Sequence, residues 1–452
     1  MFYFSNNKDS LKEISLLSFP IALDLLFLFL IFFLDSWFLS YISDDIAGSI
    51  GSLFSIFGIC AVIFRAISQA GTVLASKYMG MNEINKSRAV VSISISINLL
   101  FGLLLSALAI IFSKKIGLWL GLNEEQNIYT TIYLQIVGAS LVFLCLRYAL
   151  ASRLYISKNS ISNMVITIIM LVSSTIFNIL AILFLKGNIN MLIGISLGTM
   201  LSQILSVICL LYFVKKEDNS FYKLFSIKLL LCNFITFYKK LFSILLPVTA
   251  EPIVTQFINI AFTIIAINIS ALALTARVYV TNLQFIILAF SLAFSIGAQI
   301  LISNYFGAKQ IEKIKKSFFN SIFLLILITL LLSLPVFILK ENLFNIFTNN
   351  GDIKLLGLQV IYICLLIEFI KILGLMSTFS LVGIGDSVYP NICSILLMCF
   401  ITLPLSIFFV FYLKAGLIGI FVAQLIEESL RASILFHRFI LKIKRMGELH
   451  LH

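Results

Sequence analysis

Long apolar runs alternate with short charged segments along the whole chain. The first run, residues 14–41, consists mainly of Leu, Ile and Phe and is longer than the ~20 residues that a helix needs to cross a bilayer. Similar runs follow it, and together they predict twelve spanning helices, at residues 14–41, 47–76, 89–113, 127–152, 161–185, 190–214, 241–267, 271–302, 317–339, 355–381, 388–412 and 416–440. The pattern therefore predicts an all-α polytopic membrane protein.

Residue pairs that recur at a spacing of 227 positions divide these helices into two sets of six. The recurring pairs are Pro20 and Pro247, Asp24 and Glu251, Gly80 and Gly307, and Ser160 and Ser387. Because six is an even number, both sets enter the membrane from the same side. We therefore expect two six-helix bundles related by a pseudo-twofold axis along the membrane normal.

Basic residues gather in loops on one side of the predicted membrane, in the segments 77–88, 153–158, 215–240, 309–316 and 438–445. The positive-inside rule places these loops and both termini in the cytoplasm. The longest segment mixes Lys with Phe, Tyr and Leu, which is typical both of an amphipathic helix on the inner membrane surface and of a mobile basic linker. We expect an N-terminal lobe (1–214), a cytoplasmic amphipathic linker (215–240) and a C-terminal lobe (241–452).

The composition excludes an ordinary soluble protein. Hydrophobic residues make up 61% of the chain and charged residues 12%, and the mean hydropathy is +1.10. The net charge of +12 belongs to the cytoplasmic loops, so it indicates no nucleic-acid partner. The abundance of Ile, Lys, Asn and Phe is typical of AT-rich bacterial genomes. We expect a multi-pass protein of the bacterial inner (plasma) membrane.

The residue types that support metal or enzyme chemistry are scarce. The seven cysteines have no CxxC spacing, and all three histidines lie near the C-terminus. No HExxH or acid-rich metal motif is present in the sequence. We therefore expect no metal site, no cofactor other than a coupling ion, and no enzymatic activity.

The first helix carries two acids within its apolar run, Asp24 and Asp35. They are eleven residues apart, which at 100° per residue places both on one stripe of the helix. A carboxylate in hydrocarbon costs roughly 2.5–3.5 kcal/mol on insertion scales, so this stripe faces protein or water. Pro20, one turn before Asp24, removes a backbone hydrogen bond and allows the helix to bend.

Depth in the membrane predicts partners for some of the buried charges. Asp24 and Arg65 lie at similar depth, and so do Glu251 and Lys371, so we expect each set to form an ion pair within its bundle. Asp35 lies about 20 residues into its helix, where its bundle has no cation at matching depth. It is our candidate for a group that binds and releases a proton, and a hydrogen-bonded structural acid is the alternative.

The other buried charges have a partner one helical turn away or lie near the end of a span. Arg147 and Arg277 are near span ends and are expected to extend their head groups toward the interface. Glu428 is either functional or neutralised by a helix that the pattern does not identify. The expected local ion pairs are Glu368 with Lys371 and Glu427 with Arg431.

Short motifs spread over nearly the whole chain carry a family resemblance. They are Leu34-Asp35-Ser36, the segment Ser76 to Gly80, Asn178, Pro247, the segment Asn304 to Ala308, and Gly383 to Ser387 followed by Pro390. In this order they resemble the multidrug and toxic compound extrusion (MATE) transporters of the MOP flippase superfamily. The resemblance implies two bundles that open alternately inward and outward and export amphiphilic organic cations in exchange for H⁺ or Na⁺.

The resemblance also implies roles for individual residues. Asp35 matches the family's proton or cation coupling acid, Asn178 matches its polar partner on the fifth helix, and Thr199 is expected to line the same pocket. Two positions depart from the family pattern. Ile182 replaces an acid that many members carry, and Lys371 stands where Na⁺-coupled members carry an acid on the tenth helix.

We therefore expect a monomeric efflux transporter whose partners are an organic cation and the lipid bilayer. Asn259, Asn282 and Gln284 are candidates for the lining of the facing cavity, and helix packing is the alternative role for them. The alternative function is a flippase for a lipid or lipid-linked oligosaccharide. Such proteins favour an Arg-rich cavity, for which this chain offers few arginines.

Overall fold

The computed structural model describes residues 8–120, 122–217, 227–348 and 350–449. Helices joined by short turns make up this part of the chain, and it contains no β-strand. The first half contains α1 (Lys8–Ile42), α2 (Asp44–Gly80), α3 (Ile84–Ile111), α4 (Ser113–Trp119), α5 (Glu124–Ile156), α6 (Ser160–Phe184) and α7 (Asn188–Glu217). The second half contains α8 (Ile227–Ile269), α9 (Ala271–Gly307), α10 (Ile311–Ile338), α11 (Lys340–Phe347), α12 (Gly351–Gly383), α13 (Val388–Leu397), α14 (Leu403–Ile407) and α15 (Gly416–Leu449), with π-helical turns at Met398–Thr402 and Phe408–Tyr412.

Most of the long helices meet the requirements of a membrane span. In the described part of the chain, 11 helical segments are long and apolar enough to cross a membrane, and α13 and α14 together form one of them. The 34-residue helix α15 occupies the place of the twelfth predicted span, and charged residues interrupt its apolar surface. The prediction of an all-α polytopic protein is confirmed. The prediction did not include α4 and α11, which are too short to produce a periodic apolar signal.

The structure repeats at the same spacing as the sequence. The bounds of α2, α3 and α5 return 227 residues later as the bounds of α9, α10 and α12. Among the described residues, six of the seven with positive φ repeat as well, in the pairs Asn82 and Lys309, Lys158 and Gly385, and Gly187 and Lys414, and only Gly416 has no counterpart. Each half therefore repeats most of the helices and turns of the other, although the counterpart of α6 is the segment 388–412, which contains π-helical turns.

The chain forms two compact units, which we call the N unit (Leu23–Leu245) and the C unit (Met1–Ala22 with Leu246–His452). The division falls within α1 and α8, close to Pro20 and Pro247. The predicted lobe limits differ from this division, since position 214 lies near the end of α7 and position 240 lies within α8. These limits stay a prediction. Of the predicted linker, residues 218–226 lie outside the described residues, and the chain from Ile227 onward is already part of α8.

The start of α1 packs within the C unit. Phe19 lies against Phe290 of α9, with ring centroids 6.1 Å apart, and the Tyr305 hydroxyl donates a hydrogen bond to Glu13. Gly297 of α9 allows this approach, since a Cβ at that position would lie 3.4 Å from Cα of Ser18 and 2.1 Å from its hydroxyl oxygen. The first turns of α1 are therefore held by α9.

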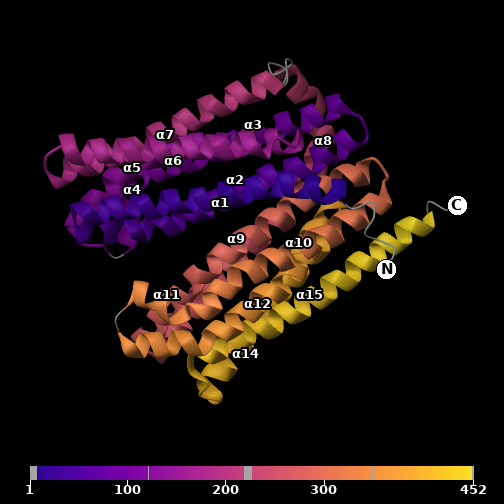
Figure 1. Cartoon of the computed structure of the whole chain (residues 1–452). Coiled ribbons are helices and arrows are strands. Elements are labelled where there is room, and N and C mark those ends of the chain that lie inside the picture. Colours follow the sequence, from indigo (N-terminus) through magenta and orange to yellow (C-terminus); the bar gives the residue numbers. More distant parts are fainter. Residues whose placement is uncertain (1–7, 121, 218–226, 349, 450–452) are drawn as a thin grey trace. The chain divides into compact units, whose positions relative to one another are not determined.

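The centre of the N unit is α5, which packs against α2, α3, α4 and α7 (Figure 1). Its buried residues Tyr133, Val137 and Leu141 are spaced by four and so lie on one face of the helix. They join buried side chains of α1, α2 and α7 in one apolar cluster.

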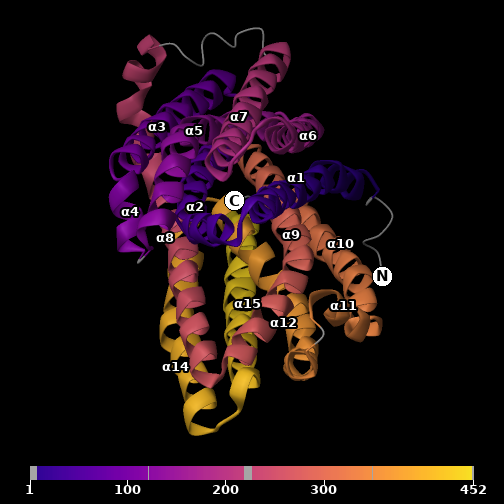
Figure 2. The same ribbon diagram turned by 90° about the vertical axis from the view of Figure 1, so that its left-hand side faces the viewer.

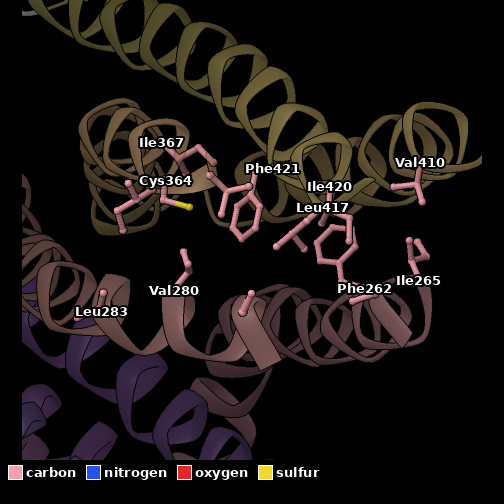
Figure 3. Close-up of a cluster of buried hydrophobic side chains, with 14 of the residues drawn as sticks. Phe262, Ile265, Val280, Leu283, Cys364, Ile367, Val410, Leu417, Ile420 and Phe421 are labelled. Atoms are coloured by element: carbon pink, nitrogen blue, oxygen red, sulfur yellow. The ribbon is translucent and has the colours of Figure 1, made fainter. Parts of the chain in front are cut away.

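The counterpart of α5 in the C unit is α12, which packs against α9, α10 and α15 (Figure 2). Figure 3 shows the apolar cluster of this unit, in which side chains of α8 and α9 point toward side chains of α12 and α15. Phe262 and Phe421 belong to this cluster and are almost fully buried. Both units thus have a central helix and an apolar core around it.

Candidate functional site

Asp35 lies on α1 within a group of neutral hydrogen-bonding side chains. Asn178 Nδ2 donates a hydrogen bond to Asp35 Oδ1 at 2.8 Å, and the Ser174 hydroxyl lies 3.3 Å from the same oxygen. The Thr199 hydroxyl of α7 lies 3.3 Å from Oδ2. Only 5% of Asp35 is exposed, and in the described part of the chain no Lys or Arg pairs with it. We call Asp35 and its three neighbours the Asp35 site.

A close approach of α7 to α6 forms this site. Gly198 precedes Thr199, and a Cβ at Gly198 would lie 2.8 Å from Cβ of Phe177 and 3.0 Å from Oδ1 of Asn178. A side chain at this position would therefore push Asn178 or α7 away. Real Cβ atoms need about 3.5–4.0 Å from other carbons.

Asp24 lies on the same face of α1 as Asp35, eleven residues before it, and forms a second polar centre. Arg147 Nη2 of α5 lies 3.2 Å from Asp24 Oδ1, and both side chains are buried. The Tyr155 hydroxyl and Asn163 Nδ2 each donate to Oδ2 at 3.0 Å, and the Thr167 hydroxyl donates to Oδ1. We call this group the Asp24 site.

The structure corrects two predictions for the Asp24 site. The expected partner of Asp24, Arg65, has an exposed side chain, and the expected interfacial residue Arg147 is 1% exposed. The reason is the length of α5, which continues to Ile156, four residues beyond the predicted span. Arg147 therefore lies nine residues, or about 14 Å of helix axis, from the end of α5.

Polar residues along one face of α6 form hydrogen bonds with both acids of α1. Asn163 and Thr167 bind Asp24, whereas Ser174 and Asn178 bind Asp35. Each residue of the first pair lies eleven residues before its equivalent in the second, which is also the spacing of the two acids. Of these four residues, only Asn178 was predicted from the sequence. The shared spacing of eleven is the signal that identifies the others.

The C unit contains a cavity of about 390 Å³ bounded by α8, α9, α12, α15 and the segment 388–412. The predicted cavity residues Asn259 and Gln284 lie in its wall. The third, Asn282, lies on an exposed face of α9 and is not part of this wall. The charged residues of the wall are Glu251, Arg277, Glu368, Lys371, Glu427, Glu428 and Arg431.

The ion pairs of this cavity differ in part from those predicted. Glu251 was expected to pair with Lys371, but it lies 3.9 Å from Arg431, while Lys371 Nζ lies 2.7 Å from Glu368 Oε1. Similar depth did not identify the partner because α15 supplies a competing arginine. The expected pair of Glu368 with Lys371 is confirmed.

Arg431 is the centre of the charge network on α15. It lies 3.5 Å from Glu427, the predicted partner, and it also pairs with Glu428 one turn before it. Arg277 was expected to extend toward the interface, but it is 7% exposed, and its Nη1 donates to the Thr263 hydroxyl at 3.1 Å. One arginine thus serves several carboxylates, and another has a neutral partner.

A family model matches the chain twice, at residues 20–180 and 247–408, and it describes the MatE family. The chain belongs to the MATE family. The two matches begin at Pro20 and Pro247, so the MATE model follows the internal repeat of 227 residues.

Similar proteins agree with this MATE membership. The chain is 25% identical over 406 residues to the uncharacterized transporter YisQ of Bacillus subtilis (strain 168), covering 90% of this chain and 89% of that protein. It is 24% identical over 220 residues, 48% of each chain, to the multidrug export protein MepA of Staphylococcus saprophyticus. A crystal structure of MATE in the bent conformation matches with a TM-score of 0.86 at 14% identity, covering 99% of this chain and 98% of that one. This MATE protein is a multi-pass membrane transporter with the twelve-helix fold.

Proposed function

We propose that this protein is a secondary active efflux transporter that exports amphiphilic organic cations in exchange for H⁺, with Na⁺ as the alternative ion. We assign the coupling to Asp35. The observation that supports this assignment is that Asp35 is buried among neutral side chains, whereas Asp24 on the same stripe has an arginine partner. An acid without a fixed cation is free to exchange one bound cation for another.

The neighbours of Asp35 suit both states of its carboxyl group. Hydroxyl groups such as those of Ser174 and Thr199 donate to a carboxylate and accept from a carboxylic acid. Asn178 Nδ2 donates to Asp35 in this structure, and Asn178 Oδ1 is a buried acceptor without a hydrogen-bond partner among the described residues. Asp35 can therefore gain or lose a proton without placing two hydrogen-bond donors opposite each other.

The transport cycle follows from competition for one negative charge. Ionised Asp35 attracts a cationic, apolar substrate, and a proton from the outside removes that attraction and releases the substrate outward. The change reaches the start of α1 through Pro20, where the helix lacks a backbone hydrogen bond and is able to bend. Return to the inward-open state carries the proton into the cell.

The setting we propose is the bacterial plasma membrane, with a monomeric protein and both termini in the cytoplasm. The distribution of Lys and Arg among the loops supports this orientation. Transporters of lipid-linked sugars need cationic groups for pyrophosphate. In the described chain Arg147 and Arg431 already pair with acids, so Arg277 is left as the cavity arginine that can face an anionic group. One such group is few for a pyrophosphate, which disfavours the flippase alternative.

The test is ethidium efflux from vesicles that contain the protein, under pH and Na⁺ gradients imposed separately. We expect a pH gradient to drive efflux in the wild type and Asp35→Asn to abolish it. The matched control is Asp45→Asn, which removes an exposed acid from the same unit and should transport normally. Normal efflux by folded Asp35→Asn contradicts the assignment of Asp35. If only a Na⁺ gradient drives efflux, the coupling ion is Na⁺ and not H⁺.

A further inference from the structure

At one end of the cavity in the C unit, carboxylate groups outnumber the cationic groups. Glu251, Glu427 and Glu428 all lie within ion-pair distance of Arg431, so three acids share one guanidinium group. Glu368 is 0% exposed and uses one oxygen for Lys371, while its Oε2 has no hydrogen-bond partner among the described residues. A buried carboxylate oxygen without a partner is costly, and it is a ready acceptor for a ligand ammonium group.

Arg277 provides a positive charge without an acidic partner among the described residues, in the wall of the same cavity. Its side chain is buried and lies in the cavity wall, its Nη1 binds only the neutral hydroxyl of Thr263, and its guanidinium group lies 5.7 Å from the ring centroid of Phe262. Among the described residues no Asp or Glu forms an ion pair with it. A buried guanidinium group with free donors is a ready site for a carboxylate, which it binds through two parallel hydrogen bonds.

The two features lie at different levels along α8. Thr263 marks the level of Arg277, and Glu251 marks the level of the carboxylates. These residues are twelve positions apart, about 18 Å of helix axis. Between them the wall contains Thr255, Ile258 and Asn259, so the middle of the cavity is partly apolar. Phe262 of the apolar cluster in Figure 3 lies in the cavity wall, next to the guanidinium group of Arg277.

We propose that this cavity binds elongated zwitterions, with the ammonium end at the Glu368, Glu427 and Glu428 carboxylates and the carboxylate end at Arg277. The volume of about 390 Å³ is within the range of small-molecule sites. The inference rests on the proposed export function only in naming the substrate class: preferred substrates are amphiphilic cations with a carboxylate at the far end. The binding site itself is independent of Asp35, which belongs to the other unit.

The test is a binding measurement by calorimetry on the purified full-length protein in detergent. The probes are 12-aminododecanoic acid, its methyl ester, which keeps only the ammonium group, and its N-acetyl derivative, which keeps only the carboxylate. We expect the zwitterion to bind about tenfold more tightly than either derivative, because each derivative loses one charged hydrogen-bonding end. The short zwitterion 4-aminobutanoic acid should show no such advantage over its ester, because it cannot reach both ends.

Substitutions connect this preference to Arg277. We expect Arg277→Gln to bind the zwitterion and its ester equally and Arg277→Lys to retain part of the preference. The matched control Arg65→Gln removes an exposed arginine and should behave as the wild type. Equal binding of zwitterion and ester by the wild type overturns the proposal, and so does a full preference in Arg277→Gln.

The same measurements separate this inference from the proposed function. Asp35→Asn should lose efflux but keep the preference for the zwitterion. If Asp35→Asn transports normally while the preference remains, the coupling assignment fails and the cavity assignment stands. If the preference is absent while Asp35→Asn loses efflux, only the cavity assignment fails.

Discussion

The N and C units repeat the same helices at a spacing of 227 residues, yet they hold their buried charges in different ways. Asp24 and Glu251 are repeat equivalents, and Arg147 neutralises the first from α5 while Arg431 lies near the second from α15. The repeat equivalent of Asp35 is Phe262, a member of the apolar cluster. The backbone repeat therefore determines where helices lie, and the side chains decide whether a position holds an exchangeable acid or apolar packing.

The two units also differ in how many ion-pair partners their buried arginines have. In the Asp24 site one acid and one arginine depend on each other, whereas Arg431 has several carboxylates within 4 Å. A single pair is sensitive to the loss of either partner, because the remaining charge stays buried alone. A network can lose one member and keep its other contacts. Four predictions, from the largest expected effect to the smallest, test this contrast.

Breaking the Asp24 site should produce the largest loss of stability. Arg147→Met leaves the Asp24 carboxylate buried without a cation, and we expect it to lower the free energy of unfolding by about 3–5 kcal/mol. Chemical unfolding in detergent measures the change. The double variant Asp24→Leu with Arg147→Met should recover most of the loss, since no buried charge remains. Equal losses in the single and double variants would show that the ion pair is not the cause.

A side chain at Gly198 should disturb the Asp35 site by overpacking. Gly198→Ala places a Cβ 2.8 Å from Cβ of Phe177, and we expect a loss of about 1–3 kcal/mol together with reduced efflux. The control is Gly48→Ala, because nothing lies within 4 Å of a Cβ at Gly48. If both substitutions have the same effect on efflux, close contact of α6 and α7 is not required.

The charge network of the C unit should tolerate the loss of one acid. In Glu427→Gln, Arg431 keeps Glu251 and Glu428 as neighbours, so we expect a loss of less than about 1.5 kcal/mol. Asp24→Asn, measured beside it, should cost about 3–5 kcal/mol. A loss as large for Glu427→Gln as for Asp24→Asn would remove the distinction between pair and network.

The neighbours of Asp35 should rank by the length of their hydrogen bonds. Asn178 lies 2.8 Å from the carboxylate and Ser174 and Thr199 lie 3.3 Å away, so Asn178→Ala should reduce efflux more than Ser174→Ala or Thr199→Ala. Each lost bond is worth about 0.5–1.5 kcal/mol. Initial rates of ethidium efflux measure the order. A larger effect of Ser174→Ala would mean that the distances do not rank the contributions.

Much of the Asp35 site was predictable from the sequence. The family resemblance grouped Asp35, Asn178 and Thr199, and the structure places all three within hydrogen-bonding distance. Their role in coupling stays a prediction. Ser174 was missed because a serine in a spanning helix is usually a packing residue. Its spacing of four from Asn178 indicates that it shares the same face, and its spacing of eleven from Asn163 matches that of the two acids.

By itself, the sequence determined the membrane-spanning character, the number of long helices and the repeat. Apolar length and residue spacing are local properties, and they survive without knowledge of neighbours. Only the tertiary structure decided the partners of the buried charges. Depth along the membrane normal is one coordinate, and many residues share it. Helix packing supplies the other two coordinates, and these brought Arg147 to Asp24, placed Arg431 near Glu251, and left Arg65 exposed.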